Sequence, residues 1–142
     1  MTKRRQAREL VLKGLYAYEI YPRDVEEIFN DLIRDSALEE DHRKFARYYM
    51  DLVVKNIELL DREITRLAEN WDLGRIAIID KIILRMALCE IRFMPDIPEK
   101  VSVNEAIDLA KEYSTTESSG FVNGILDAAM SKAPRTPPAE SS

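Results

Sequence analysis

The 142-residue sequence predicts an all-α fold of about seven helices, and three observations support this. Apolar residues recur at three- and four-residue spacings along most of the chain, as they do on the buried side of amphipathic helices. No segment shows the convincing alternation of apolar and polar residues that is typical of a strand. With only four glycines and six prolines, three of the prolines in the last nine residues, the chain also lacks the many tight turns of a β-rich fold.

The first helix is expected over about residues 3–20, and Pro22 ends it. At about 100° per residue, one face of this helix collects a core stripe made of Ala7, Leu10, Val11, Gly14 and Tyr18. On the polar face, Leu12 and Tyr16 lie four residues apart and are therefore neighbours on the helix surface. They form either a small contact patch for a partner or a pair that a second helix of the same chain covers.

The middle of the chain carries one helix-start signal and a long periodic region. Asp24 followed by Glu27 indicates the start of the second helix, and a polar loop is expected over residues 36–41. One long helical stretch then follows, with inward-facing residues over 45–67. The most apolar segment, residues 76–93, predicts a central helix that is packed on several sides.

Two further helices are expected near the end. Ser102 and Glu105 form a capping box that would open a helix running to about residue 113. A polar loop is expected over residues 114–119, and a last helix over about residues 120–132. The tail, residues 133–142, is rich in proline and serine and is expected to be disordered. The sequence therefore predicts a single helical domain over residues 1–132.

The charge distribution points to nucleic acid. The chain is acidic, with a formal net charge of -5, yet the first eight residues carry four cations and no anion: Lys3, Arg4, Arg5 and Arg8. Contacts to phosphates supply most of the affinity of nucleic-acid-binding proteins, so this end is expected to hold a phosphate backbone. The alternative is a frayed terminus that its charge keeps in solution.

Signals for catalysis are weak throughout. His42 has no partner at metal-ligand spacing, and the glycines are isolated rather than gathered in a phosphate-binding loop. We therefore expect no catalysis, no metal and no cofactor. Cys89 is the only cysteine, which fits a reducing cytosol. No apolar run reaches membrane-spanning length and no signal peptide is recognisable, so a cytoplasmic location is expected.

Five sequence segments carry a family resemblance over nearly the whole chain, from about residue 3 to residue 129. They are R-R-Q-A-R-E from Arg4, L-Y from Leu15, D-K-I-I-L-R-M-A-L-C-E from Asp80, I-P-E-K-V-S-V-N-E-A-I-D-L-A-K from Ile97 and F-V-N-G-I-L-D from Phe121. In this order and at these spacings, they resemble the NusB family of bacterial transcription antitermination factors. The V-N-E-A block followed by F-V-N-G is the most specific part.

The resemblance implies a fold of two roughly perpendicular helical subdomains. It also implies binding of boxA, a short single-stranded element in the leader of ribosomal RNA transcripts. Binding would occur together with NusE, a small-subunit ribosomal protein that doubles as a transcription factor. The pair would tether the RNA to elongating RNA polymerase, with NusA and NusG, so that the polymerase resists premature termination. Some family members form homodimers, and the sequence leaves the oligomeric state open.

The resemblance also implies two sets of site residues. The RNA-binding set would use cations for phosphates and an aromatic ring for an unpaired base, and it contains Lys3, Arg4, Arg5, Arg8, Arg85, Glu117 and Phe121. The NusE-binding set contains Leu12, Tyr16 and Asp80. On pattern alone, Arg85 fits equally well a basic surface shared with Lys81 or a pair with an acidic neighbour.

Two positions depart from the family pattern. Gly120 stands immediately before F-V-N-G, where family members often carry a basic residue, and Gln6 interrupts the arginine run. Both changes remove positive charge from the expected RNA face, so NusE would be needed to complete the site. The alternative interpretation is a helical protein–protein adaptor whose basic end binds an acidic partner, without sequence-specific RNA binding.

Overall fold

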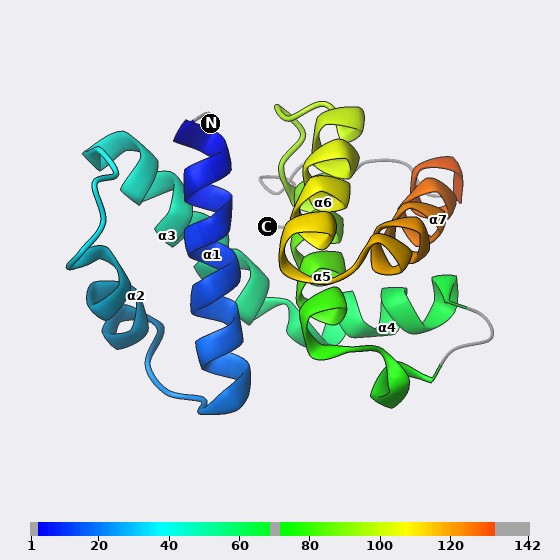
Figure 1. The fold of residues 1–142 in the computed structure, drawn as a ribbon, viewed down its shortest axis with the longest axis horizontal. Helices are drawn as coiled ribbons and strands as arrows, with labels where there is room; N and C mark the ends of the chain where they lie inside the picture. The colour runs from blue at the N-terminus through cyan, green and yellow to red at the C-terminus, as the bar shows by residue number, and fades with distance from the viewer. Residues whose placement is uncertain (1–2, 69–71, 133–142) are drawn as a thin grey trace. The chain divides into compact units, whose positions relative to one another are not determined.

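The computed structural model describes residues 3–68 and 72–132. This part of the chain holds seven α-helices, one short 3-10 turn and no strand (Figure 1), which confirms the predicted all-α fold. It divides into two compact units, Met1–Asn56 and Ile57–Ser142. The expected disordered tail, residues 133–142, lies outside the described residues.

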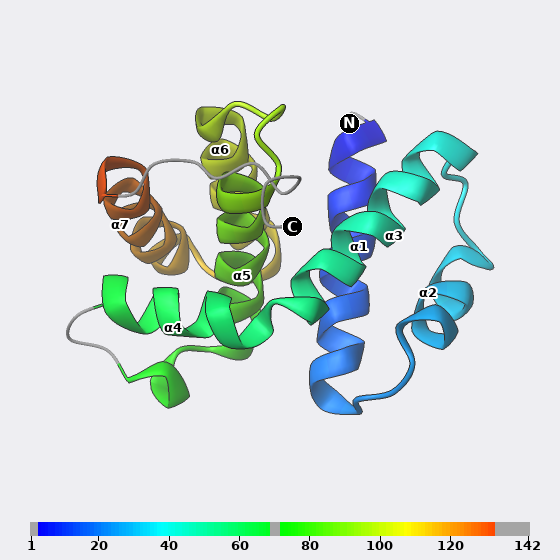
Figure 2. The same ribbon diagram turned by 180° about the vertical axis from the view of Figure 1, so that it is seen from behind.

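The first unit contains α1 (Lys3–Ile20), α2 (Val25–Ile33) and α3 (Glu40–Lys55), and α1 packs against both of the others. Figure 2 shows α3 lying diagonally across α1. At Gly14 the helices approach closely, because a Cβ there would lie 2.8 Å from Met50 Sδ and 3.2 Å from Leu32 Cδ1. The absence of a side chain at this position therefore lets α1 sit against its two neighbours.

The bounds of α1 agree with the sequence prediction, but its exposed face does not. In the expected core stripe Ala7, Leu10, Val11 and Gly14 are buried and Tyr18 is half-buried. Leu12 is buried as well, with 2% of its surface exposed. Leu12 lies four residues after Arg8 and three before Leu15, which are also buried, so these residues form a second covered stripe on α1. Of the two alternatives for Leu12 and Tyr16, coverage by the same chain therefore holds for Leu12, whereas Tyr16 is exposed.

The start of α2 is as predicted. The Asp24 side chain accepts a hydrogen bond from the Glu26 N–H at 3.3 Å, which satisfies one of the unpaired donors of the first turn. The sequence predicted one continuous helical stretch over residues 45–67, and this is wrong. Asn56 interrupts it with φ −113° and ψ 19°. Its Nδ2 donates to the Leu52 carbonyl at 2.8 Å, and its N–H donates to the Val53 carbonyl, so Asn56 closes α3.

The second unit is built around α5. It contains α4 (Ile57–Leu67), the 3-10 turn η1 (Leu73–Arg75), α5 (Ile78–Phe93), α6 (Glu99–Tyr113) and α7 (Thr116–Lys132). Helix α5 packs against α4, α6 and α7, and every residue from 82 to 92 is buried. This confirms the expectation of a central helix.

The starts of α6 and α7 both differ from the sequence prediction. The capping box at Ser102 is wrong, because α6 begins at Glu99 and the Pro98 carbonyl accepts from the Val101 and Ser102 N–H groups. Ser102 is buried, and its hydroxyl donates to Glu90 Oε1 on α5 at 2.8 Å. Helix α7 begins at Thr116 instead of residue 120.

Candidate nucleic-acid interface

Fewer cations are accessible at the start of α1 than the sequence suggests. Lys3 and Arg4 are exposed, Arg5 is half-buried and Arg8 is buried. Lys3 forms an ion pair with Glu39, and the Arg4 guanidinium lies 3.9 Å from the centre of the Phe45 ring. Stacking on an aromatic face restrains a guanidinium while its edge can still donate hydrogen bonds. Of the four predicted phosphate ligands, Lys3 and Arg4 are therefore the most accessible.

The far end of α1 carries exposed apolar side chains. Tyr16 is 42% exposed, and Ile20 and Tyr21 are more exposed still. We call these three residues the α1 patch. The sequence prediction placed Tyr16 here correctly as an exposed residue but paired it with Leu12, which is buried. The spacing of four residues between Tyr16 and Ile20 was a signal that could have found Ile20.

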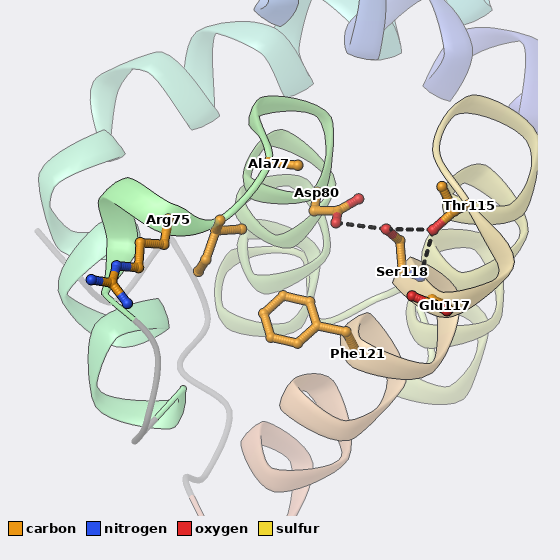
Figure 3. Close-up of a pocket in the computed structure, with 8 residues that line it drawn as sticks. Arg75, Ala77, Asp80, Thr115, Glu117, Ser118 and Phe121 are labelled. Atoms are coloured by element: carbon orange, nitrogen blue, oxygen red, sulfur yellow. Dashed lines mark hydrogen bonds between the residues drawn. The ribbon is translucent and has the colours of Figure 1, made fainter.

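A pocket in the second unit brings together three of the predicted site residues, Asp80, Glu117 and Phe121 (Figure 3). Asp80 lies in the first turn of α5, whereas Glu117 and Phe121 lie in the first two turns of α7. The pocket has a volume of about 330 Å³, and the described residues that line it are Arg75, Ile76, Ala77, Asp80, Thr115, Glu117, Ser118 and Phe121. A half-buried aromatic ring beside polar groups is suited to stacking an unpaired nucleobase.

Hydroxyl groups fix the start of α7 against α5. Ser118 Oγ donates to Asp80 Oδ2 at 2.8 Å, and the Ser118 N–H donates to Thr115 Oγ1 at 2.9 Å. The latter bond caps α7, which explains why this helix begins earlier than the sequence predicted. Asp80 is only 6% exposed, and its Oδ1 has no hydrogen-bond partner among the described residues. The expected partner-binding aspartate is thus a buried residue that positions the pocket wall.

Arg85 does not extend an open basic surface. Its Nε and Nη2 donate to Asp61 Oδ1 and Oδ2 at 2.7 and 2.8 Å, and the residue is only 7% exposed. Of the two alternatives that the pattern left open, the geometry favours the pair with an acidic neighbour. Arg85 is therefore buried, with its guanidinium bound in bidentate fashion by a carboxylate on α4, and its contact with RNA stays a prediction.

Sequence reasoning missed five residues that line the pocket beside the predicted ones, of which Ala77 contributes only a methyl group and the other four carry larger or polar side chains. These four are Arg75 at the end of η1, Ile76 directly after it, and Thr115 and Ser118 at the start of α7. Ser118 is adjacent to the predicted Glu117, so its hydroxyl was within reach of a sequence argument. Arg75 and Ile76 come from a loop whose position depends on the packing of the second unit, and no sequence signal marks them.

The described residues contain no group of three or more His, Cys, Asp and Glu side chains that could hold a metal ion. Cys89 is buried, and burial raises the pKa of its thiol far above the ordinary value, with the charge of Glu90 adding to the shift. A thiol held protonated in this way is a structural residue and not a nucleophile. No helix in the described part of the chain is long and apolar enough to cross a membrane.

An exposed cationic helix end in one unit and an aromatic-lined pocket in the other are features of proteins that bind single-stranded nucleic acids. The profile of the NusB family matches residues 5–131, so the chain belongs to the NusB family.

Relatives and solved structures agree with this assignment. The chain is 45% identical over 126 residues to transcription antitermination protein NusB of Chloroherpeton thalassium, which covers 88% of this chain but 60% of that relative. It is also 45% identical over 132 residues to the NusB protein of Salinibacter ruber, covering 92% of this chain and 82% of the relative.

Two solved structures share the fold. The structure of T. maritima NusB has a TM-score of 0.86 at 37% identity, covering 94% of this chain and 95% of that one. A chain from the crystal structure of antitermination factors NusB and NusE in complex with double-stranded RNA has a TM-score of 0.85 at 23% identity. This match covers 94% of the present chain and 99% of that one.

Proposed function

We propose that this chain is a transcription antitermination factor that binds boxA RNA together with NusE. The observation that carries the proposal is the pocket of the second unit, where Phe121 stands beside Asp80 and Glu117 in a chain of the NusB family. Binding of boxA and of NusE is inferred from membership of the family, and the pocket is the place where an unpaired base would bind. No catalytic step is part of this function.

Two kinds of contact would act on the RNA. Lys3 and Arg4 on α1 would hold phosphates, since both are exposed cations that neighbours on the same unit restrain. Phe121 on α7 would stack a base that single-stranded RNA leaves unpaired. Phosphate contacts give affinity without sequence information, so selection of boxA depends on the pocket and on NusE.

The α1 patch is the proposed NusE contact. Tyr16, Ile20 and Tyr21 are exposed apolar side chains within six residues, and tyrosine is enriched at the energetic centres of protein interfaces. A second copy of the chain is the competing occupant of this surface. Sedimentation of the protein alone and with NusE separates the two, because NusE must displace a homodimer that uses the same patch.

The proposed cellular role is that of a cytoplasmic tether. Joining boxA and elongating RNA polymerase, with NusA and NusG, through one adaptor makes later contacts intramolecular. This raises the effective concentration of weakly bound partners without requiring tight individual affinities. The polymerase would then resist termination for as long as the RNA remains attached.

The test measures binding of a fluorescent boxA RNA and a scrambled RNA, with and without NusE. We expect preference for boxA, tighter binding with NusE, and loss of affinity in a Lys3→Ala, Arg4→Ala double variant. The matched control replaces two exposed cations elsewhere on the first unit, Arg34→Ala and Lys44→Ala. Equal binding of both RNAs, unaffected by NusE, would leave the protein–protein adaptor as the better function.

A further inference from the structure

The pocket of the second unit needs a cation if it is to hold a nucleotide. Its lining includes two carboxylates, Asp80 and Glu117, and one guanidinium, Arg75. A base stacked on Phe121 would bring its own phosphate into this neighbourhood, where the carboxylates repel it. A positive side chain at the pocket would offset the repulsion, and Arg75 is the only cation among the described residues that line it.

Arg75 differs from Arg85 and Arg92 of this unit in exposure and in ion pairing. Arg85 and Arg92 are buried and form ion pairs with Asp61 and Glu63 on α4, so their guanidinium groups are committed to the protein. The Arg75 side chain is exposed, and no hydrogen bond or ion pair to it is found among the described residues.

The backbone at Arg75 is held even though its side chain is not. The Arg75 N–H donates to the Asp72 carbonyl at 2.8 Å, and the Ile76 N–H donates to the Leu73 carbonyl at 3.2 Å. These bonds close the 3-10 turn and fix the point from which the guanidinium extends. Ile76, which follows directly, is buried and also lines the pocket, so the turn supplies an apolar wall and a cation side by side.

We propose that Arg75 holds the phosphate of the RNA nucleotide whose base, under the proposed function, stacks on Phe121. In Figure 3 Arg75 lies on one side of the Phe121 ring with its guanidinium extending away from the ring, and Ser118 and Glu117 lie on the other side. Because the Arg75 side chain is exposed, it can turn toward a phosphate bound there. The volume of about 330 Å³ is at the low end of the range of about 300–1,000 Å³ for small-ligand sites, which suits one base.

This inference rests on the proposed function and deepens it. The family resemblance assigned the phosphate contact of this unit to Arg85, whose guanidinium already binds Asp61 in bidentate fashion. Arg75 supplies a positive charge that lines the pocket itself, and it stands in a turn that the resemblance did not single out.

The test compares Arg75→Ala with Arg62→Ala, a matched variant at an exposed arginine on α4 that does not line the pocket. In the presence of NusE, we expect Arg75→Ala to weaken boxA binding about 5-fold near 0.1 M salt and to reduce the salt slope by about 0.7, as loss of one single-strand phosphate contact predicts. Arg75→Lys should keep most of the slope, since it retains the charge. Arg62→Ala should change neither quantity.

A second measurement locates the phosphate. Scanning boxA with 2-aminopurine identifies the base whose fluorescence responds to Phe121→Leu, and the phosphates on either side of that base are then replaced by neutral methylphosphonates. If Arg75 holds one of them, neutralising that phosphate removes most of the effect of Arg75→Ala, because the two changes delete the same contact. Additive effects at both phosphates would overturn the assignment of Arg75.

The outcomes distinguish the two proposals. If the wild-type chain with NusE does not prefer boxA over scrambled RNA, the proposed function fails and this inference fails with it. If the wild type prefers boxA but Arg75→Ala binds like Arg62→Ala, only the inference fails. A circular dichroism melt of each variant confirms that binding is compared between folded proteins.

Discussion

The Arg85–Asp61 ion pair allows a structural role to be separated from RNA binding by measurement. The Arg85 side chain is 8% exposed and the Asp61 side chain 20% exposed, and two hydrogen bonds join them. Removing one partner of a buried ion pair commonly costs about 3–5 kcal/mol, because the other charge is left without a partner. Since Asp61 keeps some contact with solvent, we expect Arg85→Ala to lower the free energy of unfolding by about 3 kcal/mol, the low end of that range.

The assay is urea unfolding of three proteins, followed by RNA binding below the unfolding transition. The double variant Arg85→Met, Asp61→Leu replaces both charges by apolar side chains of similar size, and it should recover stability to within about 1 kcal/mol of the wild type. With NusE present, the double variant should bind boxA as tightly as the wild type does.

A different pattern would refute this reasoning. If Arg85→Ala leaves the unfolding free energy unchanged, the ion pair contributes nothing to stability. If the double variant is stable but binds boxA several-fold more weakly than the wild type, Arg85 contacts RNA as the family resemblance implied. Either result would mean that the buried pair in this structure is not the arrangement that functions in solution.

Four further predictions concern other features of the chain. Ser118→Ala should lower the free energy of unfolding by about 1–2 kcal/mol in urea, because the buried Asp80 carboxylate loses its donor; an unchanged value would contradict the anchoring role. Tyr21→Asp should weaken NusE binding about 10-fold or more by calorimetry, whereas Val101→Asp, at an exposed site on α6, should not, and equal effects would argue against the α1 patch. Cys89 should resist a thiol reagent in the native protein at pH 8 and react once urea unfolds the chain, and rapid native labelling would contradict its burial. Because its pKa is raised in the fold, stability should fall as the pH rises above the ordinary thiol value of 9.0, where only the unfolded thiol ionises.

Sequence patterns predicted helix bounds correctly where residues in or next to the helix set those bounds. The bounds of α1 follow from helical periodicity and from Pro22, and the start of α2 follows from the capping side chain of Asp24. The errors arose where a residue had a stronger use elsewhere. Ser102 has the sequence pattern of a helix cap, but its hydroxyl donates a hydrogen bond to Glu90 on another helix. Asn56 carries no clear sequence signal, yet its side chain ends α3 by bonding the carbonyl four residues earlier.

The candidate site was predicted in part. Asp80, Glu117 and Phe121 came from the family resemblance, and the structure brings them to one pocket. The resemblance could not say that Asp80 would be buried against Ser118, since those residues lie 38 positions apart. Their roles in binding stay predictions until the RNA and NusE measurements are made.

The sequence by itself determined the all-α class, the cationic N-terminal end and the family, because these depend on periodicity, composition and motif order. Only the tertiary structure decided which charged and apolar groups remain available. The Arg85 guanidinium forms an ion pair with Asp61, 24 residues away, and the Leu12 side chain is buried. Arg75, in contrast, is exposed and lines the pocket. The physical reason is that helical periodicity fixes the direction of a side chain around its own helix, whereas burial and ion pairing depend on which other segment packs against that face.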